Sequence, residues 1–398
     1  MTAITTPAGR HTWSLNESDC RLEDLVALVE RSTELVDYPN ASSVIDNVPI
    51  YDSQRVRDEM ATAEGRDGLQ AELVHALTDG PGLVVFQGAF ADLSVVDRAS
   101  AAFDAMIADQ KARGTAAGDH FAKPGANDRV WNALEKLAVR APDVFVDYYS
   151  NDVLALIFTA WLGPAYQVTS QINVVNPGGE AQSPHRDYHL GFMTNERAAQ
   201  FPVHAHALSP VLTLQGAVAH SDMPVVSGPT MYLPHSQTYP AGYLAWRRPE
   251  FIEYFEHNHV QLPLSKGDAA FFNPALLHGA GHNRSTDIKR MANLLQVSSA
   301  FGRAMESVDR TKISNAIYPT LAARSSAGAD AQALRNVISA AAEGYSFPTN
   351  LDRDQPVDGL APETQAELVE RALQERWPAT RLADELINYL ARRRTDDP

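Results

Sequence analysis

Residues 183–189 read SPHRDYH, and they follow a stretch rich in β-forming residues. Side chains two positions apart on a strand point to the same face, so His185 and Asp187 can bind one metal ion from the same side. A third ligand is available further along, where His278 lies in the stretch NPALLHG at 273–279. Two histidines and one carboxylate with open positions form the facial triad of non-haem Fe(II) oxygenases. This spacing predicts an oxygen-activating enzyme.

The sequence offers more than one histidine as the third ligand. We favour His278 because it follows an apolar run and precedes Gly279, a setting typical of a buried position. The main competitor is His282, which lies in the polar turn GHNRS at 281–285. Further candidates for the third ligand are His189, His220, His257 and His259.

The bulk composition indicates a folded protein that acts on a small molecule. The chain has 398 residues, 44% of them hydrophobic, and a formal charge of −16. An acidic protein repels DNA, RNA and anionic membrane surfaces, so we expect no nucleic-acid or membrane partner. The single cysteine, Cys20, excludes an intramolecular disulfide framework and favours a cytoplasmic location. We expect no signal segment or membrane span, and a monomer or homodimer.

The sequence patterns predict helices first, then β-strands, and then helices again. Between about residues 166 and 302, short apolar stretches are separated by turn sequences such as NPGG at 176–179. Many short strands with such spacing predict a sandwich or barrel, and a double-sheet jelly roll is one solution. We therefore expect a mainly β core with flanking helices. The expected strands are 166–175, 208–219, 230–233, 259–264, 269–272 and 288–299.

A glycine-rich segment at 114–130 has no periodicity. It is either a surface loop or a lid over the site, because long loops near sites often carry function. If it is a lid, its side chains and those that follow the metal pair contact the substrate. The candidate substrate residues are Phe121, Lys123, Arg129, Trp131, Tyr188, His189 and Phe192.

Several motifs together resemble the phytanoyl-CoA dioxygenase family of Fe(II)/2-oxoglutarate oxygenases. They are DGPGLVVFQG at 79–88, PHRD at 184–187, GPTMYLPHS at 228–236, GDAAFF at 267–272 and LHGAGHNRS at 277–285. The resemblance implies a double-stranded β-helix with flanking helices. It also implies a core at 79–302, between an N-terminal helical and loop extension at 1–78 and a C-terminal helical extension at 303–398.

The resemblance further implies that His185, Asp187 and His278 bind Fe(II), with 2-oxoglutarate as cosubstrate and O2 as oxidant. Family members place a basic residue, usually arginine, about eleven residues after the last ligand, where it binds the distal carboxylate of 2-oxoglutarate. That position holds Lys289 here, and Arg290 follows it. We favour Arg290, because a guanidinium binds a carboxylate through two hydrogen bonds. Neighbouring strand residues face opposite ways, so only one of the two is expected to reach the cosubstrate.

Two further features bear on the implied reaction. Family members often carry serine two residues after the distal histidine, where this chain has Ala280. Gln171, Asn173 and Gln215 lie on expected strands and are candidates to supply that missing hydrogen bond. Related halogenases replace the ligand carboxylate with glycine or alanine, so Asp187 favours hydroxylation. The substrates of the family range from acyl-CoA thioesters and osmolytes to natural products of secondary metabolism.

A different class of protein is a competing interpretation. Cupin-like isomerases and non-catalytic ligand-binding proteins use a His-x-His pair with a glutamate a few residues downstream. The pairs at 204–206 and 257–259 both lack that glutamate. A small-molecule hydroxylase dependent on Fe(II) and 2-oxoglutarate is therefore the leading prediction.

Overall fold

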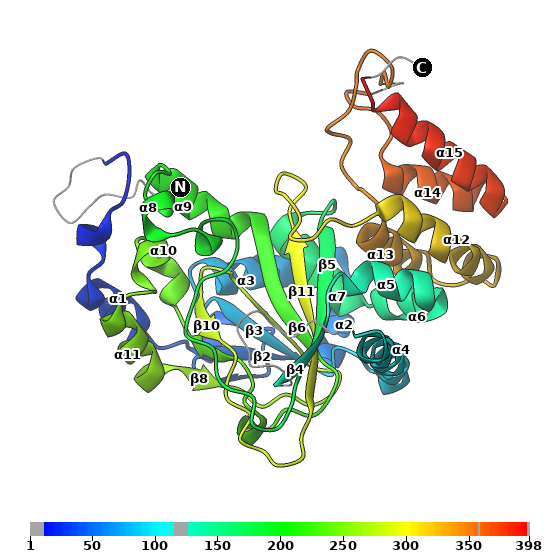
Figure 1. The fold of residues 1–398 in the computed structure, drawn as a ribbon. Coiled ribbons are helices and arrows are strands. Elements are labelled where there is room, and N and C mark those ends of the chain that lie inside the picture. The colour runs from blue at the N-terminus through cyan, green and yellow to red at the C-terminus, as the bar shows by residue number, and fades with distance from the viewer. Residues whose placement is uncertain (1–11, 115–125, 357–358, 396–398) are drawn as a thin grey trace.

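The computed structural model describes residues 12–114, 126–356 and 359–395, and its centre is a large mixed sheet (Figure 1). In the described part of the chain this sheet has eight strands, in the order β1-β2-β3-β9-β6-β11-β5-β4. Only the β2–β3 pair is parallel. The sheet is open, with β1 and β4 at its edges. Its strands are β1 Ser43–Ile45, β2 Val48–Asp52, β3 Leu83–Gln87, β4 Asn127–Val130, β5 Gln167–Val175, β6 Thr213–Ala219, β9 Ala269–Phe272 and β11 Arg290–Ser298.

A second, three-stranded sheet faces part of the first. Its order is β10-β7-β8, with β10 at Leu277–Gly279, β7 at Met231–Leu233 and β8 at Val260–Gln261. Alternate side chains of β3 point to opposite faces of the large sheet, so they belong to two different hydrophobic cores. Val84 and Phe86 pack with the helices, whereas Leu83 and Val85 pack toward the small sheet. Helices, large sheet and small sheet thus form three successive layers.

Helices cover the outer face of the large sheet and both ends of the fold (Figure 1). The last four α-helices, α12 to α15, lie together at the upper right of the view. Leu382 and Leu386 on α15 are fully buried in the main core cluster. The α-helices are α1 Leu22–Val29, α2 Ser53–Met60, α3 Ala63–Thr78, α4 Leu93–Ala112, α5 Ala133–Arg140, α6 Pro142–Tyr149, α7 Asp152–Leu162, α8 Asn195–Ala198, α9 Val203–Leu208, α10 Gly242–Ala245, α11 Pro249–Asn258, α12 Arg310–Ser326, α13 Ala331–Ala341, α14 Gln365–Gln374 and α15 Ala379–Arg392. The 3-10 helices are η1 Glu17–Asp19, η2 Leu35–Asp37, η3 His189–Phe192, η4 Ser209–Leu212, η5 Val225–Ser227 and η6 Ser236–Thr238.

Local chemistry sets the boundaries of several elements. Residues 39–49 contain β1 and the start of β2. Helices α6 and α7 are separate, because Asn151 begins α7 by accepting a hydrogen bond from the Leu154 amide. The strand expected from 208 starts only at Thr213, since α9 and η4, with Pro210 in its first turn, occupy 203–212.

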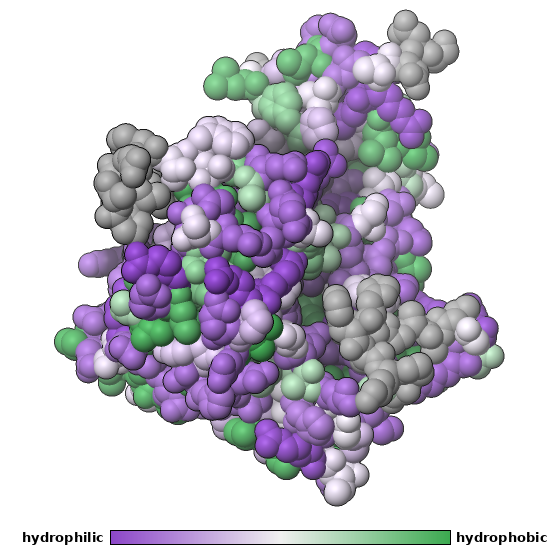
Figure 2. Space-filling model, turned by 60° about the vertical axis from the view of Figure 1, so that its left-hand side comes forward, coloured by the Kyte–Doolittle hydropathy of each residue, from purple (hydrophilic) through white to green (hydrophobic). Residues whose placement is uncertain are grey.

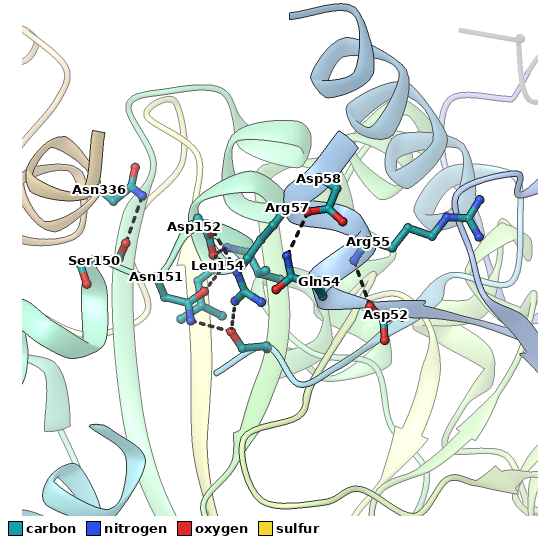
Figure 3. Close-up of polar contacts among 12 residues, drawn as sticks. Asp52, Gln54, Arg55, Arg57, Asp58, Ser150, Asn151, Asp152, Leu154 and Asn336 are labelled. Atoms are coloured by element: carbon teal, nitrogen blue, oxygen red, sulfur yellow. Dashed lines mark hydrogen bonds and ion pairs between the residues drawn. The ribbon is translucent and has the colours of Figure 1, made fainter. Parts of the chain in front are cut away.

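Polar contacts join helix α2, which follows β2, to the body of the fold (Figure 3). Arg57 donates from Nη2 to the carbonyl of Ala89 over 2.7 Å and from Nε to both carboxylate oxygens of Asp152 over 3.1 Å. Asn151 donates to the same Ala89 carbonyl over 2.8 Å. Because β2 also pairs with β3, the N-terminal segment is built into the large sheet.

The molecular surface is mostly polar on the face that Figure 2 shows, with apolar residues in small groups. Over the described residues, no helix combines the length and the apolar character needed to cross a bilayer.

Candidate metal centre

Backbone pairing brings the two ligand-bearing segments together. His185 forms an isolated antiparallel bridge with His278, whose strand β10 is in the small sheet. The His185 amide donates to the His278 carbonyl over 2.9 Å, and the reverse bond measures 3.2 Å. The Asp187 amide donates to the carbonyl of Pro274 over 3.0 Å. These bonds align two stretches that are far apart in the sequence.

The three side chains converge on one point. Nε2 of His185 lies 3.7 Å from Oδ1 of Asp187, and Nε2 of His278 lies 3.4 Å from Oδ2. One ligand atom from each of the three side chains lies within 4.8 Å of the other two. Among the residues that the structure describes, this is the one group of three or more such side chains that could hold a metal ion. His282 and both His-x-His pairs lie outside it.

The hydrogen bonds of both imidazoles suit metal binding through Nε2. Nδ1 of His185 lies 2.9 Å from the carbonyl oxygen of Ser183, and Nδ1 of His278 lies 2.9 Å from that of Leu276. A carbonyl accepts only, so each Nδ1 carries a proton, and Nε2 of each ring is the nitrogen available to a metal ion. A neutral imidazole whose other nitrogen donates to a carbonyl is the usual form of a metal-ligating histidine.

Asp187 is held as a carboxylate. Burial by itself raises the pKa of this group, but the neighbouring His185 and His278 outweigh that effect and hold the pKa below its ordinary value. Gln215 on β6 donates to Oδ2 over 2.6 Å and also lowers the pKa. The side chain is therefore ready to act as a charged ligand at neutral pH.

Arg290 and Lys289 point in different directions. Arg290, the first residue of β11, is 6% exposed and lines the pocket next to the triad, whereas Lys289 is exposed. Burial lowers the pKa of Arg290 to about 10, so the guanidinium stays charged at neutral pH. The register of β11 then places Ala292, Leu294 and Gln296 on the same pocket wall.

The triad and Arg290 lie in one cavity of about 430 Å³, which both sheets line. Gln171, Asn173 and Gln215 line it as well. Within the described chain, Nη1 of Arg290, Oδ1 of Asn173 and Oε1 of Gln215 are buried without a hydrogen-bond partner. Unsatisfied buried polar atoms are rare in folded proteins, and these three lie around the same cavity. This donor and acceptor set fits a metal ion together with a small dicarboxylate such as 2-oxoglutarate.

The candidate substrate residues divide into three groups. Arg129, Trp131 and Phe192 line the cavity, and the Arg129 guanidinium stacks 4.6 Å from the centre of the Trp131 ring. Phe121 and Lys123 lie outside the described residues, as does most of the expected lid at 114–130.

Tyr188 and His189 do not line the cavity. Both have positive φ angles, 61° and 41°, so the chain turns sharply after Asp187. Tyr188 is buried against Phe192, and Nδ1 of His189 forms a 3.0 Å hydrogen bond with Ser209. Their role as substrate contacts stays a prediction, and the cavity wall itself is formed by other residues. A strand pattern does not reveal a left-handed turn.

Sequence reasoning missed several cavity residues. Gln296 lies six positions after Arg290 on β11, and the strand period of two could have identified it. Gln182 binds the Ala280 amide through Oε1 over 3.1 Å, and no local pattern marks that contact. Met305 lines the cavity from beyond the last strand, in a segment that the family motifs do not reach.

The chain is similar to a known protein family and to several solved structures. No curated protein sequence matches it. The solved structures that resemble it include SnoN, a non-heme alpha ketoglutarate dependent epimerase from nogalamycin biosynthesis, with 20% identity and a TM-score of 0.40 over 60% of this chain and 84% of SnoN. AviO1 from Streptomyces viridochromogenes Tue57 has 18% identity and a TM-score of 0.42 over 59% of this chain and 96% of its own.

The site is that of an enzyme of the Fe(II)/2-oxoglutarate superfamily, with a His-Asp-His group in a β-rich core. The profile of the phytanoyl-CoA dioxygenase family matches residues 66–291, more than half of the chain. The chain belongs to this family. Its members use Fe(II), 2-oxoglutarate and O2, and the residues of the cavity fit these groups.

Proposed function

We propose that the protein is an Fe(II)/2-oxoglutarate-dependent dioxygenase that hydroxylates an unactivated C–H bond of a small molecule. One observation carries the proposal: His185, Asp187 and His278 form a metal-ligand group in the same cavity as the buried, charged Arg290. In the balanced reaction, 2-oxoglutarate, O2 and the substrate give succinate, CO2 and the alcohol. When bound, Fe(II) supplies the activation of O2 that this chemistry requires.

Each residue of the site has a defined role in this proposal. The two Nε2 atoms and the Asp187 carboxylate would hold the metal, and a set of two histidines and one carboxylate is the ligand set of oxygen-activating non-haem iron enzymes. Gln215 orients the carboxylate through its 2.6 Å hydrogen bond. Arg290 would bind the distal carboxylate of 2-oxoglutarate, and Ala292 and Leu294 line the cavity beside it.

We further propose that Gln171 and Asn173 on β5 provide hydrogen bonds to the cosubstrate or the substrate. The orphaned Oδ1 of Asn173 supports this, as does the position of both side chains on the cavity wall. Arg129 on β4 and Trp131, which directly follows β4, are the proposed substrate contacts. Phe121 and Lys123 stay candidates for the same role.

We also propose that the facing sheets form the double-stranded β-helix of the family, although the large sheet is open. In this division the catalytic core is 79–302, with extensions at 1–78 and 303–398. The N-terminal extension contributes more than helices and loops, because β1 and β2 continue the core sheet beside β3.

An anaerobic titration tests the proposed function. Apo protein is titrated with Fe(II) and 2-oxoglutarate while the weak visible metal-to-ligand charge-transfer band is recorded, in the wild type and in His278→Ala. We expect a band in the wild type that is lost in the variant, and succinate formation once O2 is admitted. Fe(II) binding without a band would reject a 2-oxoglutarate-dependent reaction.

A further inference from the structure

Besides their direct backbone bonds, the two segments that carry the metal ligands are both hydrogen-bonded to Ser236. Its hydroxyl accepts a hydrogen bond from the amide of Leu277, next to His278, over 2.8 Å. Its carbonyl accepts one from Nη2 of Arg186, which lies between His185 and Asp187, over 2.5 Å. We infer that Ser236 is a positioning residue that sets the two ligand-bearing segments in register. The inference rests on the proposed metal site and adds a residue to it.

Ser236 is itself held firmly. It is fully buried, and its hydroxyl donates to the carbonyl of Leu233 over 2.6 Å. Leu233 is the strand partner of Leu277 in the β7–β10 pair. The Ser236 hydroxyl thus bridges the β7–β10 pair, because it donates to Leu233 and accepts from Leu277.

Arg186 completes the link from the other segment. It is 2% exposed, and Nη2 also donates to the carbonyl of Tyr239 over 3.1 Å. Within the described residues it forms no ion pair with a carboxylate; instead its guanidinium lies 5.2 Å from the ring centre of Tyr243. Burying a charge is costly unless hydrogen bonds compensate, so its partners must be fixed in place. Those partners are the backbone carbonyls of Ser236 and Tyr239.

Gly242 makes room for this guanidinium. A Cβ atom at that position would lie 1.8 Å from Cζ of Arg186. Any larger residue there must therefore displace Arg186 from the Ser236 carbonyl. This offers a way to disturb the link without touching Ser236 or a metal ligand.

The link acts on the metal through the ligands. Removing the hydroxyl leaves the Leu277 amide buried without a partner and releases the start of β10 beside His278. Groups that orient metal ligands typically change metal affinity by about 10–100-fold when they are removed. A loosened ligand pair is expected to bind metal more weakly even when the fold survives.

Co(II) binding tests the inference, because its visible spectrum reports ligand geometry without turnover. Ser236→Ala is compared with Ser227→Ala. Ser227 is also fully buried, and its hydroxyl donates to a carbonyl three residues back, that of Pro224, over 2.8 Å. We expect Ser236→Ala to weaken Co(II) binding by about tenfold or more and to change the spectrum, whereas Ser227→Ala leaves both unchanged. Thermal unfolding of both variants in EDTA measures the purely structural cost.

Gly242→Ala is the second variant and is expected to weaken Co(II) binding in the same direction. Wild-type affinity in both Ser236→Ala and Gly242→Ala would overturn the inference and leave the proposed function intact. An equal loss of affinity in Ser227→Ala would also overturn it, because the effect would then be one of general stability. Co(II) binding in the wild type that does not depend on His278 would overturn the metal site itself, and the inference with it.

Discussion

Gln215 donates a 2.6 Å hydrogen bond to Oδ2 of Asp187, the same oxygen that lies 3.4 Å from Nε2 of His278. Gln215 belongs to β6, in the centre of the large sheet, whereas His278 belongs to β10 in the small sheet. One carboxylate oxygen therefore lies next to side chains from both sheets. A ligand held in this way needs little rearrangement to bind a metal ion.

The identity of the third ligand can be tested by paired substitutions. His278→Ala is expected to abolish stoichiometric Fe(II) binding and the charge-transfer band with 2-oxoglutarate, because it removes one of three ligand atoms. His282→Ala is the matched control, since it removes a histidine from the following turn. Anaerobic titration of both variants distinguishes them, and loss of the band in His282→Ala alone would exchange their roles.

The carboxylate anchor is testable at two adjacent residues. Arg290→Met is expected to weaken 2-oxoglutarate binding by about 100-fold, since a charge-assisted bond contributes about 3 kcal/mol at most and 1.4 kcal/mol is a factor of ten. Lys289→Met removes the same charge from an exposed side chain and should leave the affinity unchanged. Titration of each Fe(II)-loaded variant with 2-oxoglutarate measures the difference. The reverse result would assign the anchor to Lys289.

A buried histidine makes stability depend on pH. His220 lies between Ser100 and Tyr148, at 2.9 Å from each, and burial lowers its pKa from 6.5 to about 3. Below pH 6.5 the imidazole of His220 becomes protonated in the unfolded chain but stays neutral in the folded chain. The contribution of His220 to the free energy of unfolding is therefore present above pH 6.5. It is lost as the pH falls toward 3, by about 1 kcal/mol per pH unit.

Urea unfolding of apo protein at pH 7, 6 and 5 measures this dependence. His220→Gln should be less stable than the wild type at pH 7 and should show a shallower decline. His257→Gln, an exposed site on α11, should keep the wild-type slope. An unchanged slope in His220→Gln would show that other groups cause the decline.

The contacts of Arg57 predict a measurable contribution to stability. Arg57→Ala removes the bonds to Asp152 and to the Ala89 carbonyl that hold α2 against the body of the fold (Figure 3). We expect a loss of about 1–2 kcal/mol, mostly from the bond to the carbonyl, because Asp152 is 45% exposed. Gln54→Ala on the same helix removes only an exposed bond to Asp58 and should cost less than about 0.5 kcal/mol. Equal unfolding midpoints for both variants would contradict this role.

Much of the site could be predicted from local patterns. The period of two places His185 and Asp187 on one face, and the motifs around His278 indicate the family that the profile match confirms. The β core between flanking helices is predictable as well, from short strands and turn sequences. The positive φ angles after Asp187 are not, because the sequence there carries no glycine to mark a left-handed turn.

By itself, the sequence determined the kind of site: two histidines and a carboxylate, a basic residue after the last ligand, and a β-rich core to hold them. Only the tertiary structure decided that His278 rather than His282 joins His185 and Asp187, and that Arg290 rather than Lys289 enters the cavity. Only it made Ser236 a neighbour of both ligand segments. The physical reason is that sequence periodicity acts over a short range, and it sets only which face a side chain occupies within one element. The distance between elements depends on pairing and packing across the whole chain.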